Sequence, residues 1–99
     1  NYVIDGQTGI LRPAANARCA STGIIMQVDT TSPGVQFYTA NSLNEGRRGK
    51  SGSVYGPHHG FCLETQFFPD TPNHKNFPSV CLKAGDIFDH TTVFSFGVM

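Results

Sequence analysis

The sequence predicts an all-β fold of the sandwich or barrel kind. Apolar residues come in short runs separated by turn signals, and no stretch predicts a helix of three turns. The 99 residues include 11 Gly and 6 Pro, which favours a turn-rich chain. A domain of this length would bury roughly 60–68% of its unfolded-chain surface. We therefore expect one small all-β unit and no second domain.

In the first half of the chain, β-branched and aromatic runs end at pairs of residues typical of turns. Pro13–Ala20 is ambiguous, although its last four residues suit extended backbone. The predicted strands here are Tyr2–Ile4, Gly23–Thr30 and Val35–Thr39.

In the second half, a loop rich in Gly and basic residues is predicted at Asn41–Gly56, and a Pro-rich loop at Pro69–Pro78. The predicted strands are Phe61–Gln66, Val80–Lys83 and Thr91–Val98.

Charge and hydropathy argue against two classes of partner. Seven basic and seven acidic residues give a formal net charge of zero, so electrostatic capture of nucleic acid or of an anionic membrane is not expected. No apolar stretch approaches the roughly 20 residues that span a bilayer. The first residues, Asn1–Asp5, read as a strand entered in its middle, with neither an initiator Met nor a leader, as after proteolysis or separate encoding.

The three cysteines, Cys19, Cys62 and Cys81, cannot all pair within the chain. Their odd number and wide spacing predict reduced thiols. The sequence also has no Asn-x-Ser/Thr acceptor for glycosylation. Both observations favour a cytoplasmic location.

Two predicted strands put polar groups on one face, because side chains alternate across a strand. Amides, a phenol and a carboxylate together suit a sugar, whose hydroxyls need donors and acceptors. The alternative is an ordinary solvated sheet face, on which a glutamate is commonplace. The predicted polar face consists of Gln36, Tyr38, Cys62, Glu64 and Gln66.

Metal and phosphate chemistry are not indicated. His58 and His59 are adjacent and would point to opposite faces, while His74 and His90 suit cap or turn positions, so no metal site is expected. Gly49-Lys50-Ser51 ends like a phosphate-binding loop, but the earlier Gly of that motif is replaced by Asn44 and no helix follows.

The chain resembles the aldose 1-epimerases (galactose mutarotases) in the order and spacing of several motifs from residue 33 onward. Supporting matches occur at Gly49–Tyr55 and Gly85–Thr92. The principal matching stretches are Pro33–Asn41, Gly60–Gln66 with Phe68-Pro69-Asp70 after it, and Asn73–Ser79.

This resemblance implies a β-sandwich of the galactose mutarotase type, of which residues 1–99 would be the C-terminal strands of a single domain. It implies that Glu64 is the general base and Gln36 a sugar-binding amide. The family's acid histidine, a second sugar-binding histidine, an arginine and an aspartate would lie upstream, the aspartate just before Asn1. Ala40 departs from the family's usual Gly, and it would cost around 1 kcal/mol if that position needs a positive φ.

The implied reaction interconverts the α and β anomers of hexoses such as galactose and glucose. A base and an acid on opposite sides of the sugar open and reclose the ring without a metal or nucleotide cofactor. Partial burial beside Phe61, Phe67 and Phe68 would suit Glu64 as the base. We expect these residues alone to be inactive. If the upstream part accompanies them as a separate chain, activity should appear. A non-catalytic carbohydrate-binding or structural module, and a cleavage product held to its companion chain, remain alternatives.

Overall fold

A computed structural model of the chain describes residues 1–43 and 46–99. Within these residues the regular structure is strand, apart from one 3₁₀ turn, so the predicted all-β class is confirmed. In chain order the elements are β1 (Tyr2–Val3), β2 (Arg12–Arg18), β3 (Ile24–Thr30), β4 (Gly34–Tyr38), β5 (Arg47–Arg48), β6 (Val54–Tyr55), β7 (Cys62–Gln66), η1 (Thr71–Asn73) and β8 (Thr92–Val98).

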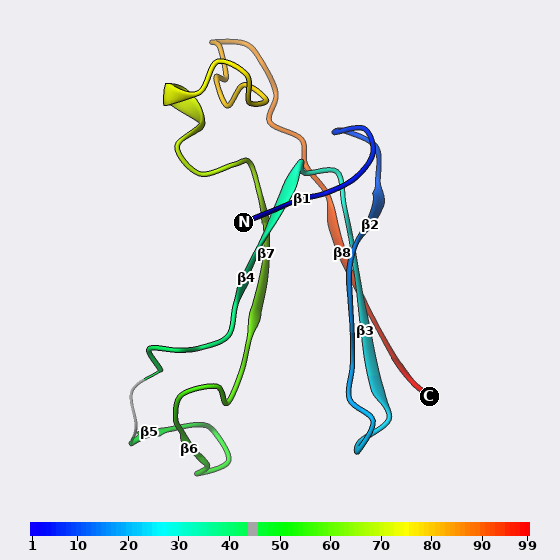
Figure 1. Cartoon of the computed structure of the whole chain (residues 1–99), viewed down its shortest axis with the longest axis vertical. Coiled ribbons are helices and arrows are strands. Elements are labelled where there is room, and N and C mark those ends of the chain that lie inside the picture. The colour runs from blue at the N-terminus through cyan, green and yellow to red at the C-terminus, as the bar shows by residue number, and fades with distance from the viewer. Residues whose placement is uncertain (44–45) are drawn as a thin grey trace.

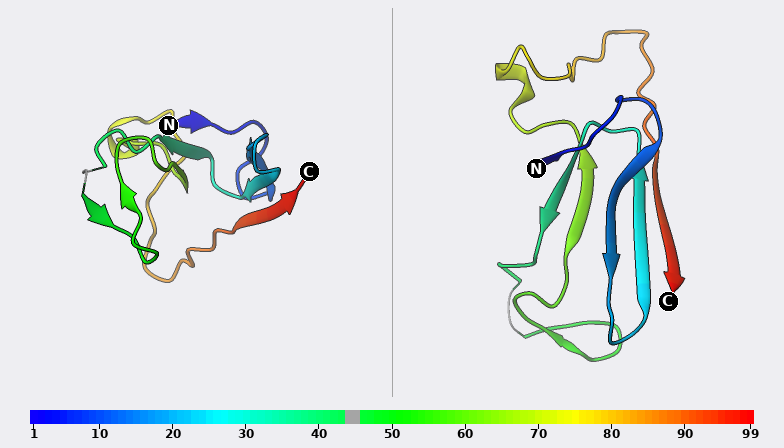
Figure 2. Two further views of the ribbon diagram at one scale, coloured as in Figure 1. Left: turned by 90° about the horizontal axis from the view of Figure 1, so that it is seen from below. Right: turned by 45° about the vertical axis from the view of Figure 1, so that its right-hand side comes forward.

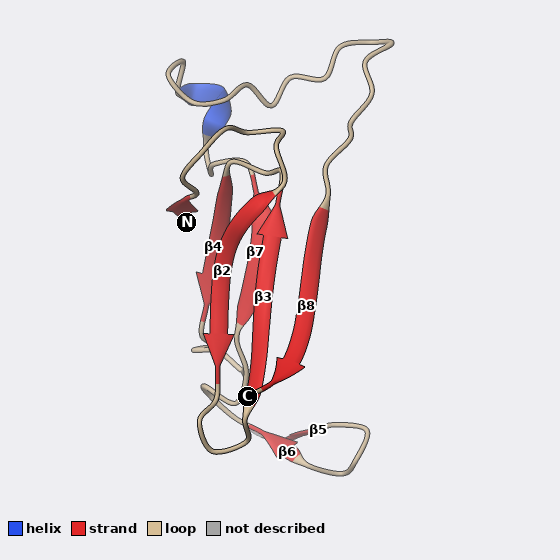
Figure 3. Ribbon diagram, turned by 90° about the vertical axis from the view of Figure 1, so that its right-hand side faces the viewer, coloured by secondary structure: helices blue, strands red, loops and turns tan. Residues whose placement is uncertain are grey.

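Two three-stranded antiparallel sheets form the body of the molecule (Figure 1). One has the strand order β1-β4-β7 and the other β2-β3-β8, while β5 and β6 form a separate hairpin. Figure 3 shows β2, β3 and β8 in front of β4 and β7, so the sheets are two layers. In Figure 2 the layers also stand apart when the molecule is seen from below. The architecture is that of a sandwich made of few strands.

For most strands, the bounds predicted from the sequence agree with the observed bounds within a residue or two. The predicted strands at 2–4, 23–30, 35–39, 61–66 and 91–98 correspond to β1, β3, β4, β7 and β8. The ambiguous stretch at 13–20 overlaps β2, which begins at Arg12 and carries a bulge between Pro13 and Ala15. Proline is tolerated there because β2 is an edge strand.

The predicted strand at Val80–Lys83 is wrong. The segment is not paired with any strand in the described part of the chain, and both Val80 and Leu82 are exposed. Local side chains take its backbone donors instead: the Ser79 hydroxyl accepts from the Cys81 N–H, and the Asp86 carboxylate accepts from the Lys83 N–H. An apolar alternation without a neighbouring strand does not form a ladder.

The predicted loop at Asn41–Gly56 is wrong in part. Two of its residues, Asn44 and Glu45, lie outside the described residues. Beyond them, Arg47–Arg48 pairs antiparallel with Val54–Tyr55 in a short hairpin. A Cβ at Gly49 would collide with the Tyr55 ring, so the turn of this hairpin needs glycine there.

Arg12 links the chain segments that connect the two sheets. Its half-buried guanidinium donates to backbone carbonyls of segments that pass from one sheet to the other. Arginine suits this position because its planar fork offers five donors and no acceptor. The acceptors are the carbonyl oxygens of Asp5 at 2.8 Å, Ser32 at 3.1 Å, Ile10 at 3.2 Å, Thr30 at 3.3 Å and Ile4 at 3.5 Å.

A chain of threonine hydroxyls makes a second link between the sheets. Thr65 on β7 and Thr92 on β8 are 2.6 Å apart between their Oγ1 atoms, and Thr92 is 3.1 Å from the Oγ1 of Thr30 on β3. The Thr30 hydroxyl also donates to the Thr91 carbonyl and accepts from the Ser32 N–H. Thr30 is fully buried, so these bonds compensate for the loss of its contact with water.

The apolar core is small for a chain of this length. Among the described residues the buried apolar side chains are Ile4, Val28, Val35 and Ala40. The accessible surface is 7398 Å² for 10.7 kDa, whereas a compact protein of that mass exposes about 5,500 Å². The radius of gyration is 16.6 Å, against about 13 Å for a compact domain of this size. Much apolar surface therefore stays uncovered in this chain.

We expect Arg12→Met to lower the free energy of unfolding by about 2–3 kcal/mol, because it keeps the apolar stem and leaves part-buried carbonyls without a donor. Arg18→Met, at the exposed end of the same strand, is the matched control and should change it by less than about 0.5 kcal/mol. Urea unfolding of the protein expressed from its complete gene measures both. Equal losses in the two variants would contradict the assigned role of Arg12.

Candidate functional site

Gln36 and Glu64 lie directly opposite each other in the ladder between β4 and β7. The antiparallel register pairs Gly34 with Gln66, Gln36 with Glu64 and Tyr38 with Cys62. Residues opposite each other in such a pair share a face, with Cβ atoms about 4.5–5.5 Å apart. The predicted common face of Gln36, Tyr38, Cys62, Glu64 and Gln66 is therefore confirmed, and we call it the polar face.

The polar face is the outer face of its sheet. The alternate side chains of the same two strands point toward the other sheet, where Val35, Phe37 and Leu63 line a cleft of about 630 Å³ together with alanines of β2. Thr65, which also alternates with Glu64, contacts Thr92 of the opposite sheet. The parity of the strands thus directs Gln36 and Glu64 away from the apolar space between the layers.

Hydrogen bonds tie two other side chains of the polar face, Gln66 and Tyr38, to neighbouring segments. The Gln66 side-chain amide donates to the Asn1 Oδ1 at 3.3 Å, which brings the first residue of the chain to the rim of the polar face. Nothing in the local pattern around Asn1 indicates this contact. The Tyr38 hydroxyl accepts from the Ser42 N–H at 3.0 Å, so the phenol is tied to the loop after β4.

Gln36 is half-buried and Glu64 is exposed. The expected partial burial of Glu64 among phenylalanines is therefore wrong for this chain. Phe61 has the opposite parity and pairs with Phe37 at a centroid distance of 6.2 Å. Phe67 and Phe68 lie beyond the end of β7, where they pack against His90 and Phe77 respectively. Glu64 is therefore open to solvent on the polar face of this chain.

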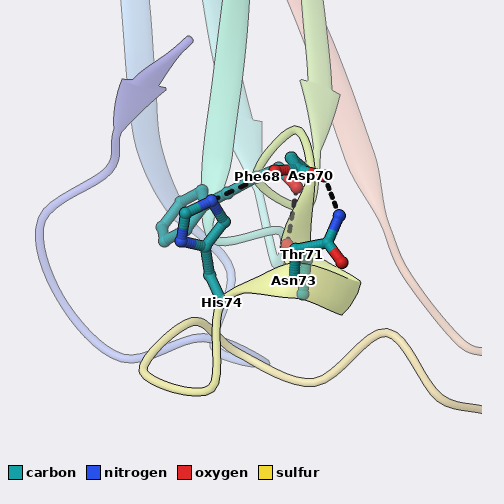
Figure 4. Close-up of polar contacts among 5 residues, drawn as sticks. All are labelled: Phe68, Asp70, Thr71, Asn73 and His74. Carbon is teal, nitrogen blue, oxygen red and sulfur yellow. Dashed lines mark hydrogen bonds and ion pairs between the residues drawn. The ribbon is translucent and has the colours of Figure 1, made fainter.

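A tight turn holds the end of β7, the strand that carries Glu64 (Figure 4). Asp70 has a φ of 61° and precedes the 3₁₀ helix η1. Its carboxylate accepts from the Asn73 side chain at 2.6 Å and lies 3.2 Å from the His74 Nε2. The Thr71 hydroxyl donates to the Phe68 carbonyl at 2.5 Å. This turn redirects the chain immediately after the strand.

The histidines take turn and cap roles, as predicted. His74 caps η1 and stacks on Phe77, and the His90 Nδ1 lies 3.4 Å from the Thr31 hydroxyl. The His59 Nδ1 accepts from the Gly56 N–H at 3.1 Å, while the His58 ring bonds to the Thr39 carbonyl. None of the four histidines occupies a rung of the β4–β7 ladder.

The Gly49-Lys50-Ser51 motif lies in the β5–β6 hairpin, apart from the polar face. In the part of Gly49-Lys50-Ser51 and its surroundings that the structure describes, the Gly49 and Gly52 N–H groups bond within the β5–β6 hairpin, to the Ser53 and Gly49 carbonyls. No helix follows this turn before β6.

The three cysteines are free and exposed. Hydrogen bonds from the Ser21 hydroxyl, 3.2 Å from the Cys19 sulfur, and from Thr22 lower the pKa of that thiol to about 7. Cys19 lies in the turn between β2 and β3, on the other sheet. Cys62 is the cysteine that lies on the polar face.

In the described residues, no helix has both the length and the apolar character to cross a bilayer.

Comparison with known proteins finds relatives of one family. The family model for aldose 1-epimerase matches residues 1–95. The chain is 52% identical to galactose mutarotase of Bos taurus over 87 residues, which are 88% of this chain and 25% of that protein. It is 51% identical to galactose mutarotase of Homo sapiens over 84 residues, 85% of this chain and 25% of that protein.

A more distant relative is the aldose 1-epimerase of Escherichia coli (strain K12). It is 33% identical over 85 residues, which are 84% of this chain and 24% of that protein. The chain thus spans about a quarter of the length of the curated relatives it matches. A family model that matches nearly the whole chain, together with relatives at about half identity, leads to one conclusion: the chain belongs to the aldose 1-epimerase family.

Proposed function

We propose that the protein is an aldose 1-epimerase that interconverts the α and β anomers of hexoses such as galactose and glucose. Residues 1–99 would be the C-terminal part of a single mutarotase-like sandwich domain. The observation that carries the proposal is the ladder pairing of Gln36 with Glu64 on an outer polar face, in a chain of this family.

Glu64 acts as the general base in this proposal. Its carboxylate removes the proton from the anomeric hydroxyl, the bond between C1 and the ring oxygen breaks, and the ring oxygen takes up a proton. Rotation about C1–C2 and reclosure on the other side give the second anomer. Proton transfer of this kind contributes typically about 10²–10⁴-fold to the rate.

Gln36 orients the sugar beside the base. Its amide offers two donors and an acceptor, and it stands on the same rung as Glu64. A sugar hydroxyl can therefore bond to Gln36 while its neighbour approaches the carboxylate. Tyr38 and Gln66, on the adjacent positions of the same face, extend this polar surface along the two strands.

The acid that protonates the ring oxygen would come from the upstream part of the protein. Family resemblance assigns it to a histidine, and the four histidines of this chain serve turns and caps. Resemblance also puts an aspartate just before Asn1, whose side chain bonds to Gln66 at the rim of the polar face. An upstream segment would thus reach the sugar from this side.

The upstream part would also cover the apolar surface left open here. Phe96 and Val98 on β8 are 71% and 77% exposed, on the face of the sheet that carries buried Val28. Packing against additional strands would bury these side chains. Each Å² of apolar surface removed from water would add roughly 25 cal/mol of stabilisation. The partner proposed for this surface is therefore the remaining sandwich of the same protein, in one chain or two.

A non-catalytic carbohydrate-binding module is the second candidate. It is favoured by one observation: among the described residues, the polar face of this chain carries one carboxylate, Glu64, and no histidine. Such a module would bind sugar through Gln36 and Glu64 without changing its anomeric form. Whether the complete gene encodes the acid histidine distinguishes it from the enzyme.

Free, exposed cysteines are compatible with the cytoplasmic location that we propose for either protein.

We predict that Glu64→Gln lowers kcat for mutarotation of α-D-galactose by about 10²–10⁴-fold, because the amide keeps the shape and cannot take the proton. Polarimetry on the protein expressed from its complete gene measures the rate. Asp29→Asn is the matched control, since it removes a strand carboxylate from the other sheet and should leave the rate unchanged. Normal turnover of the Glu64→Gln variant would remove Glu64 from its proposed role.

We predict that the isolated 99-residue chain does not accelerate mutarotation above the buffer rate, because it lacks the acid. Its uncovered apolar face should also make it self-associate, which light scattering would detect. The matched control is the same chain mixed with the upstream part, expected to recover activity. Polarimetry that shows turnover by the isolated chain would contradict the proposed division of the site.

A further inference from the structure

Backbone strain in the described residues is concentrated around the two strands of the polar face. Three residues other than glycine have a positive φ: Ala40 at 56°, His58 at 62° and Asp70 at 61°. Ala40 follows β4, His58 precedes β7 and Asp70 follows β7. A left-handed backbone costs about 1–3 kcal/mol in such residues and persists only where the surroundings enforce it. Contacts around these three residues must therefore hold their backbones in this conformation.

Ala40 meets the condition under which alanine was expected to be strained, because its backbone occupies the positive-φ region that favours glycine. Its carbonyl is held from two sides: the His58 N–H donates to it at 3.1 Å and the Leu43 N–H at 3.3 Å. The side chain of Ala40 is also buried. Two hydrogen bonds and burial together keep the residue in its strained form.

The His58 ring adds a second hydrogen bond to the same strand end, and we call these two His58 bonds the clamp. Its Nδ1 lies 2.8 Å from the Thr39 carbonyl oxygen. Since a carbonyl can only accept, Nδ1 carries the proton, and it does so in the neutral and the charged ring alike. His58 therefore bonds to two consecutive carbonyls, of Thr39 through the ring and of Ala40 through the backbone.

This clamp lies just beyond the last rung of the ladder. The β4–β7 pairing ends at Tyr38 and Cys62, one alternation away from Gln36 and Glu64. Past that rung the chain leaves the sheet for the β5–β6 hairpin and then returns to β7 (Figure 1). A ladder end without further bonds frays, and fraying here would shift Gln36 relative to Glu64.

We propose that His58 is a positioning residue for the reaction: by bonding to the Thr39 and Ala40 carbonyls it fixes the end of β4 and keeps Gln36 in register with Glu64. The inference rests on the proposed function of that pair. The His58 ring touches neither sugar nor reacting atoms in this role. Its contribution is geometric, and misplacement by about 1 Å in such a site costs up to about 100-fold in rate.

Two substitutions separate the hydrogen bond from the strain. Asparagine tolerates a positive φ and places a side-chain N–H close to the position of the histidine Nδ1, whereas glycine tolerates the same backbone and has no donor. We expect His58→Gly to lower kcat for α-D-galactose about tenfold or more, and His58→Asn to restore most of it. The matched control is His59→Ala, which removes only the bond to the Gly56 N–H and should turn over normally.

The experiment is polarimetry and urea unfolding on the protein expressed from its complete gene, with Glu64→Gln alongside. Loss of kcat in His58→Gly, without a comparable loss of unfolding free energy, supports the inference. Normal kcat in His58→Gly, or equal losses in the Gly and Asn variants, would overturn it while an inactive Glu64→Gln leaves the proposed function intact. Full activity of Glu64→Gln would overturn the proposed function and this inference with it.

Discussion

The contact between Thr65, Thr92 and the buried Thr30 is the interaction on which the arrangement of the two sheets depends. Few apolar side chains are buried, so a packed core does not by itself fix one layer against the other. The threonine hydroxyls join β7 to β8 and β3 at one end, and the Arg12 guanidinium joins the chain segments that cross between the layers. Polar groups in part-buried positions must find partners, and here the partners lie on opposite sheets.

This junction determines which way the candidate site faces. Thr65 points inward to meet Thr92, and its neighbour Glu64 must then point outward, because successive side chains alternate. The ladder pairing brings Gln36 beside Glu64 on that outer side. The inner face keeps Val35, Phe37 and Leu63 for packing. One polar contact thus separates the apolar interior from the surface proposed to bind a sugar.

The ends of β4 and β7 show how the register is protected where the ladder stops. Ala40, His58 and Asp70 adopt left-handed backbones at these ends, and each is held by hydrogen bonds from its own loop. Strain of this kind needs local reinforcement, since it opposes folding by about 1–3 kcal/mol per residue. The fold accepts that cost at the two strands that carry Gln36 and Glu64. Apolar side chains such as Phe96 and Val98, by contrast, stay exposed in this chain.

The amino-acid sequence alone predicts the all-β class, the approximate limits of most strands, the common face of Gln36 and Glu64, and the family. These follow from alternation, turn residues and motif order, which are properties of neighbours along the chain. It does not predict that Val80–Lys83 stays unpaired among the described residues, that Glu64 is exposed, or that His58 reaches the Thr39 carbonyl 19 residues away. Pairing, burial and side-chain contacts of this kind depend on segments distant in sequence. A local pattern therefore states which face a residue occupies, but not what lies against that face.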